Sequence, residues 1–216
     1  MKSASVFLSI ALSGTLLTAQ AFATQAATRP AADLAPNMMD ELDPYDPNIN
    51  NILKEMDQNY EQETGTLPFL QERPQFFSLP CSRQNCDVYI NIVKSKMPQK
   101  AYVYVEGRLA YEWLTSTGVQ GRGTPNFDQH PDEPLRIYDK YTSGKFPGGD
   151  YNGLGNMPYA VFIRGGFAIH GTARSNWGRL GSPASHGCIR LHPDNGKIFN
   201  RLVRQYGRSR TWVTVN

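Results

Sequence analysis

Short segments dense in Val, Ile and Tyr recur from residue 88 onward and predict β-strands. These segments lie at residues 88–93, 101–105, 108–115, 159–164, 167–170 and 211–215, with a further short strand possible at 135–138. Turn residues separate them, and residues 119–157 are rich in Gly, Pro, Asp and Asn, as expected of long loops. Strands do not alternate regularly with helices, so a doubly wound parallel sheet is not expected. The pattern predicts a mainly β domain.

Apolar residues recur at helical spacing in only two places. Residues 51–62 place Ile52, Leu53, Met56 and Tyr60 on one face, and Gly65 ends the pattern. We expect a short helix docked on the main domain, although a partner-binding helix is an alternative. A second helix is predicted after residues 192–195 and ends at Gly207.

The N-terminus has the pattern of a secretory signal peptide. Lys2 precedes an apolar run at residues 4–17, and small residues at 21–23 provide a cleavage site, so residues 1–23 are the predicted signal peptide. The run is shorter than the roughly 20 residues of a membrane span, although an uncleaved anchor is the alternative. Residues 24–50, rich in Ala, Pro, Asp and Asn, are predicted to be a flexible tether. We therefore expect export to the periplasm and no membrane association after cleavage.

Composition narrows the function classes. The 216 residues suit one domain with tails, and 40% are hydrophobic, which is ordinary for a globular protein. The formal net charge is only +3, and the basic residues are scattered along the chain. Nucleic-acid binding, which needs a basic patch or stripe, is not expected.

Three cysteines leave an odd one in an exported protein. In an oxidising compartment Cys81 and Cys86 can form a disulfide across four residues, leaving Cys188 as a thiol. The disulfide loop would close a segment at residues 51–86 that carries the first helix and an extended, proline-containing stretch. Cys188 is then a nucleophile, an inert buried thiol or half of an intermolecular disulfide.

Residues 170–191 concentrate the candidate chemistry. They contain Cys188 with two possible bases, His170 and His186, and each histidine is followed by a glycine. A thiol with a pKa of about 8.5 is mostly protonated near neutral pH, so nucleophilic attack needs a neighbouring base. The three residues could also ligate zinc, although the paired spacing of structural zinc sites is missing.

His170, a spacer of fourteen residues and Ser185-His186-Gly187-Cys188-Ile189-Arg190 together resemble the signature of the L,D-transpeptidase (YkuD) family. These enzymes remodel bacterial peptidoglycan. The resemblance covers about residues 88–216 and leaves the first eighty residues out. It implies a β-sandwich-like catalytic domain of mixed sheets with one packed C-terminal helix, at residues 87–216.

The resemblance also implies residue roles. It makes Cys188 the nucleophile and His170 the base, with the Gly171 carbonyl holding the imidazole tautomer. Any residue has such a carbonyl, so glycine at position 171 is not expected to matter. His186 becomes a support residue, with the base role as its alternative.

Other predicted contributions are less specific. The backbone N–H groups of Gly187 and Cys188 are candidate oxyanion donors. Ser185 is expected to hydrogen-bond across the site or to cap a turn, and Arg190 to bind a substrate carboxylate or form a structural salt bridge. Trp177 and Tyr159 could form an aromatic wall, although core packing is the simpler explanation for Tyr159.

The predicted reaction is acylation of Cys188 by a peptidoglycan tetrapeptide stem at meso-diaminopimelate, with release of D-Ala. An amine then accepts the acyl group, giving a 3–3 crosslink or a link to an envelope protein; water as acceptor would make the enzyme a hydrolase. A zinc-binding module and a silent wall-binding protein are the remaining alternatives. No cofactor or metal is expected. The run 124–127 departs from the family pattern after its Ser-Thr-Gly strand end, so the acceptor stays open. The sequence does not predict the oligomeric state.

Overall fold

Two β-sheets form the core of the computed structural model, which describes residues 42–71, 81–141 and 151–216. The first sheet has the strand order β3-β2-β1-β8-β4 and the second has the order β5-β6-β7. The first comprises β1 (Val88–Val93), β2 (Lys100–Val105), β3 (Arg108–Leu114), β4 (Phe127–Gln129) and β8 (Thr211–Val215). The second comprises β5 (Val161–Arg164), β6 (Phe167–Gly171) and β7 (Ile189–Leu191).

Each sheet mixes strand directions. β1 pairs antiparallel with β2 and parallel with β8. In the second sheet β6 pairs antiparallel with β5 and parallel with β7. The prediction of a mainly β domain with mixed sheets is therefore confirmed.

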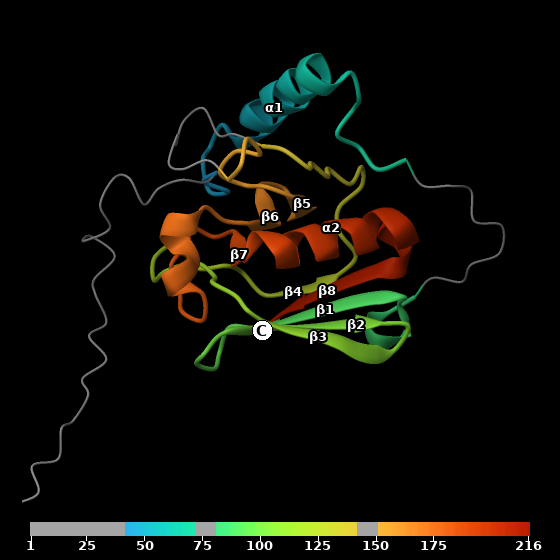
Figure 1. The fold of residues 1–216 in the computed structure, drawn as a ribbon, viewed down its shortest axis with the longest axis vertical. Helices are drawn as coiled ribbons and strands as arrows, with labels where there is room; N and C mark the ends of the chain where they lie inside the picture. The colour runs from blue at the N-terminus through green and yellow to red at the C-terminus, as the bar shows by residue number, and fades with distance from the viewer. Residues whose placement is uncertain (1–41, 72–80, 142–150) are drawn as a thin grey trace, which may run out of the picture. The chain divides into compact units, whose positions relative to one another are not determined.

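Helix α2 (Pro193–Tyr206) is the predicted C-terminal helix, and it lies between the two sheets (Figure 1). It contacts both β6 and β1. Its apolar face buries Phe199 and Val203 completely. The helix begins with a proline at its first turn, preceded by His192 as N-cap, and Gly207 ends it, as expected from helix-capping preferences. Its first turn packs against the end of β6, which matters for the site below.

Helix α1 (Ile49–Thr64) packs over the second sheet, on the side away from α2 (Figure 1). Leu53 and Met56 are buried in a cluster with Tyr138 and Phe162. Arg136 forms an ion pair with Asp57 of the helix, and the Tyr138 hydroxyl donates a hydrogen bond to the same carboxylate. The docked helix predicted from residues 51–62 is present, and it begins two residues earlier.

Three short 3₁₀ helices complete the described elements: η3 (Arg83–Asn85), η4 (Arg174–Arg179) and η5 (Arg208–Arg210). The structure differs from the predicted strands at three places. Residues 135–138 contribute only isolated bridges, from Arg136 to Phe69 and from Ile137 to Val161, and the short strands β4 and β7 were not predicted. Segments of three or four residues carry too little periodicity to identify, and tertiary pairing decides their state.

The end of the predicted tether also differs. Leu42 and Pro44 are buried, and residues 43–48 form turns that lead directly into α1. The predicted signal peptide and the earlier part of the tether lie outside the described residues. The described residues all belong to one compact unit, and none of their helices is long and apolar enough to cross a membrane.

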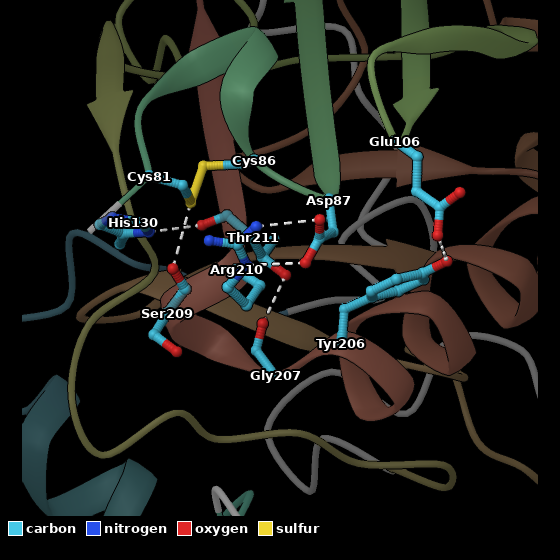
Figure 2. A network of polar contacts seen from close by, with 10 residues as sticks. All are labelled: Cys81, Cys86, Asp87, Glu106, His130, Tyr206, Gly207, Ser209, Arg210 and Thr211. Atoms are coloured by element: carbon cyan, nitrogen blue, oxygen red, sulfur yellow. Dashed lines mark hydrogen bonds and ion pairs between the residues drawn. A yellow bond between two sulfur atoms is a disulfide. The ribbon is translucent and has the colours of Figure 1, made fainter. Parts of the chain in front are cut away.

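A disulfide joins Cys81 and Cys86 beside the C-terminal strand (Figure 2). Near it, Arg210 forms an ion pair with Asp87, which links the beginning of the sheet-forming chain to its end. His130 Nδ1 lies 2.7 Å from the carbonyl oxygen of Thr211. These contacts close the domain at one end of the first sheet.

Candidate active site

His170 lies in β6 and is completely buried. Its Nδ1 is 2.7 Å from the carbonyl oxygen of Gly171, the next residue in the strand. A carbonyl oxygen can only accept a hydrogen bond, so Nδ1 carries the proton and Nε2 is the basic nitrogen of the neutral ring. The structure thus places the Gly171 carbonyl where it can fix the tautomer of His170.

Cys188 immediately precedes β7, the strand that pairs with β6. His170 lies opposite Arg190 in this parallel ladder, and Cys188 is two residues before Arg190, just outside the strand. The side chain is completely buried, and Sγ lies 3.6 Å from the carbonyl oxygen of Gly166. Pairing of β6 with β7 therefore brings together residues that are eighteen positions apart in the sequence.

The residues before Cys188 form a turn. Gly187 has a φ of +131°, which L residues rarely adopt. The Ser185 hydroxyl closes the turn: it donates to the Cys188 carbonyl at 2.5 Å and accepts from the Gly187 N–H at 3.1 Å. Of its two predicted roles, Ser185 has the turn-capping one.

This turn changes the prediction for the oxyanion donors. The Gly187 N–H is directed to Ser185 rather than outward, so it does not serve as a donor in this arrangement. The Cys188 N–H stays a predicted donor. His186 is buried in the turn, with 6% of its surface exposed, and its support role also stays a prediction.

Arg190 forms structural contacts next to the turn that carries Cys188. Its side chain is almost fully buried, and Nη1 donates a hydrogen bond to the carbonyl oxygen of Ala184 at 2.8 Å. Its backbone pairs with Ser116 in both directions. This hydrogen bond supports a structural role for Arg190, and the substrate-carboxylate role stays a prediction.

The two predicted aromatic residues lie near α2. Trp177, in η4, donates from Nε1 to the Thr172 carbonyl at 3.0 Å, and its ring lies 4.2 Å from that of His192. Tyr159 has a φ of +59° and lies under the Lys197 ammonium, 5.7 Å from the ring centroid. Partial burial raises the pKa of the Tyr159 phenol. Both rings are only partly buried, so an aromatic wall stays a prediction.

Glycine at position 171 matters for a reason that the carbonyl argument missed. A Cβ atom there would lie 2.8 Å from Pro193 Cα and 3.1 Å from Pro158. A Cβ on Gly196 would in turn meet the Gly171 backbone at 2.8 Å. The two glycines let the first turn of α2 pack directly on the strand that carries His170, as the close-approach role of glycine allows.

Thr124 is a site residue that sequence reasoning missed. Its buried hydroxyl donates to the Gly187 carbonyl at 2.7 Å and accepts from the Gly118 N–H at 2.9 Å. It thereby ties the turn before Cys188 to the segment after β3. The departure from the family pattern at residues 124–127 drew attention to this run, but only the folded chain shows what its threonine contacts.

The described residues contain one group of side chains with the spacing of a metal site, namely Cys81, Cys86 and His130. Its two sulfur atoms are bonded to each other and are therefore not thiolate ligands (Figure 2). The predicted zinc set of His170, His186 and Cys188 does not form such a group in this part of the chain. The zinc-binding alternative loses its structural support.

Comparison with known proteins identifies the domain. Residues 87–215, more than half of the chain, match the model of YkuD, the L,D-transpeptidase catalytic domain. No curated protein matches. Solved structures that match include an L,D-transpeptidase from Mycobacterium smegmatis (25% identity, TM-score 0.43, covering 61% of this chain and 59% of that one). L,D-transpeptidase 3 from Mycobacterium tuberculosis also matches (17%, TM-score 0.46, 61% of each chain). The chain thus spans about 60% of the length of these structures.

Proposed function

Because the chain belongs to the YkuD family of L,D-transpeptidase catalytic domains, we propose that it is an exported cysteine L,D-transpeptidase acting on peptidoglycan stem peptides. The observation that carries this proposal is the contact between His170 Nδ1 and the Gly171 carbonyl, in the strand next to the Cys188 turn. A histidine with a fixed tautomer beside a buried thiol is the arrangement that thiol acyl transfer requires.

In the proposed first step, His170 Nε2 takes the proton of the Cys188 thiol. The sulfur attacks the carbonyl carbon at the L-centre of meso-diaminopimelate in a tetrapeptide stem. The C–N bond to the terminal D-Ala then breaks, and the leaving amine takes the proton from His170. The products of this step are a thioester on Cys188 and free D-Ala.

In the second step an acceptor amine attacks the thioester, its proton passes to His170, and the C–S bond breaks. The proton then returns to the sulfur. A diaminopimelate side chain as acceptor gives a 3–3 crosslink, and a lysine of an envelope protein gives an anchored protein. Water as acceptor gives a shortened stem, which is the hydrolase alternative.

Export is part of the proposal. A disulfide between Cys81 and Cys86 is typical of proteins that fold in an oxidising compartment, which supports the periplasm as the site of action. The predicted signal peptide would supply the route.

The test uses defined disaccharide-tetrapeptides with the full-length mature chain. We expect D-Ala release, a covalent adduct on Cys188 by intact mass, and no release by Cys188→Ala. His170→Gln should retain the fold but lower acylation by about 10²-fold or more, because a general base contributes at least that much. D-Ala release that survives Cys188→Ala, or an adduct on another residue, would contradict the proposal. The identity of the product reports the acceptor.

A further inference from the structure

Neither Cys188 nor His170 has any exposed surface in this structure. The proposed reaction needs a stem peptide in contact with the sulfur, so part of the protein has to move before the reaction. The part that moves has to lie over the thiol and be held weakly enough to open while the domain stays folded.

Residues 42–49, which we call the strap, lie against the backbone on which Cys188 depends. A Cβ atom built on Gly187 would be 2.7 Å from Pro44 Cγ and 3.3 Å from Tyr45. A Cβ on Gly166, whose carbonyl contacts the Cys188 sulfur, would be 2.7 Å from Ile49 and 2.9 Å from the Pro44 backbone. The strap thus touches both glycines that flank the thiol, and only the absence of side chains there leaves room for it.

The strap also shares its apolar packing with the thiol. Leu42 and Cys188 belong to one buried cluster, together with residues from α1. The Leu42 N–H is directed to the Met157 sulfur, which belongs to the same cluster. The Tyr45 ring packs edge-on against Phe167 of β6 at a centroid distance of 5.3 Å. The strap, which lies outside the family domain at residues 87–215, therefore packs in the same buried cluster as the thiol.

Two polar contacts of the strap lie near the surface. Asp43 forms an ion pair with Arg122, and the Tyr45 hydroxyl donates to the Gly123 carbonyl. In the ion pair the Arg122 side chain is 45% exposed and that of Asp43 is 17% exposed, and Tyr45 is 48% exposed. Ion pairs near the surface contribute little to stability, so these two polar contacts can break at low cost. Opening of the strap also has to separate its apolar contacts, and local opening of a segment while the rest of a protein stays folded has a free-energy cost below that of global unfolding.

We propose that the strap is an autoinhibitory segment, which occupies the approach to Cys188 and must leave before a stem peptide can acylate the thiol. This inference rests on the proposed function for its consequence, but the burial itself can be measured without any substrate. The folded enzyme is then latent, with its reaction rate limited by how often the strap opens.

The experiment measures access to the sulfur directly. Folded full-length mature protein is incubated with iodoacetamide, which forms an S–C bond with the thiol as iodide leaves, and the adduct is followed by intact mass. The other two cysteines are in the disulfide and do not react. We expect slow labelling of the wild type. The double variant Asp43→Ala/Tyr45→Ala should be labelled at least about tenfold faster. Removing contacts that close the strap raises the population of the open state, and the labelling rate is proportional to that population.

Two control variants separate opening of the strap from other effects. Glu55→Ala, on the exposed side of α1, should be labelled at the wild-type rate. Val203→Ala removes buried volume from α2 and lowers global stability away from the strap. Equal acceleration in Val203→Ala would mean that global unfolding exposes the sulfur, and the proposal would be wrong. It would also be wrong if the double variant were labelled no faster than the wild type while still folded.

Release of D-Ala from tetrapeptide stems distinguishes this proposal from the proposed function. Faster labelling together with faster D-Ala release in the double variant supports both the autoinhibitory strap and the transpeptidase function. Faster labelling without D-Ala release by any variant supports the strap and contradicts the transpeptidase function. Equal labelling, with D-Ala released at one rate by wild type and double variant, supports the function and overturns the strap.

Discussion

At the scale of single residues, the site depends on the reacting side chains and equally on glycines, whose lack of a Cβ atom allows close packing. Gly171 and Gly196 allow α2 to approach the strand of His170, and Gly187 allows the turn that presents Cys188. These glycines lie in or beside the signature from which the family resemblance was recognised. Their packing role could not be seen in the sequence, because their neighbours come from distant segments.

Gly171→Ala should destabilise the protein. The added Cβ would lie 2.8 Å from Pro193 Cα, which is backbone and cannot rotate away. Overpacking of this kind costs about 1–3 kcal/mol, so we expect a lower melting temperature and slower acylation as His170 shifts. Gly178→Ala is the matched control, since a Cβ there meets nothing within 4 Å. Equal melting temperatures for the two variants would refute the packing argument.

Thr124 should act as a positioning residue. Thr124→Val keeps the shape but removes the hydroxyl that joins the Gly187 carbonyl to the Gly118 N–H. We expect kcat for D-Ala release to fall about tenfold with KM nearly constant, while stability falls by about 1–2 kcal/mol. Thr124→Ser, which retains the hydroxyl, should restore kcat. A variant that loses stability but keeps kcat would show that the hydroxyl serves only the fold.

At the scale of elements, the long strands and both helices were predictable from periodicity and β-branched composition. Helix α1 and strands β1 and β2 have many residues that agree on one state. β4 and β7 have only three residues each, and their pairing partners decide their conformation. The turn at Ser185–Cys188 was missed for the same reason: its shape depends on a side-chain hydroxyl and on Thr124 from another segment.

Helix α1 is held in part by a hydrogen bond from the buried Tyr138 phenol. This contact should make the free energy of unfolding fall as the pH rises into the alkaline range. Burial and the adjacent Asp57 carboxylate raise the pKa of Tyr138 far above its ordinary value of about 10. Below pH 10 the phenol is neutral in both states. Above pH 10 it ionises only in the unfolded chain, so the free energy of unfolding falls as pH rises.

Urea unfolding at pH 9, 10 and 11 would check this dependence. Tyr138→Phe should lower stability at pH 9, because the hydrogen bond to Asp57 is lost, and should show a smaller further loss toward pH 11. Tyr111→Phe, on the exposed strand β3, should follow the wild-type curve. If Tyr138→Phe loses as much stability as the wild type between pH 9 and 11, the phenol is not the titrating group.

At the scale of the whole molecule, the family domain was predictable and the cover over its thiol was not. The spacing of His170, Ser185 and Cys188 identified the domain, and the match to residues 87–215 shows the family. Residues 42–48 have few apolar side chains, and their composition resembles that of a flexible tether. Their burial depends on two glycines more than a hundred residues away, a relation that no local pattern contains.

The disulfide should stabilise one end of the domain without affecting the chemistry. It closes a loop with four residues between the cysteines, and loop-entropy arguments give such a short loop about 2 kcal/mol. The double variant Cys81→Ser/Cys86→Ser should therefore unfold at a lower urea concentration than the wild type.

In this variant, faster amide exchange should be confined to η3, the start of β1 and the adjoining end of β8, where Arg210 contacts Asp87. Because Cys188 lies next to the other sheet, immediately before β7, its rate of alkylation should stay at the wild-type value. Wild type reduced with dithiothreitol serves as the matched control and should unfold like the double serine variant. Unchanged stability in both would show that the ion pair and the sheet hold this end without the disulfide.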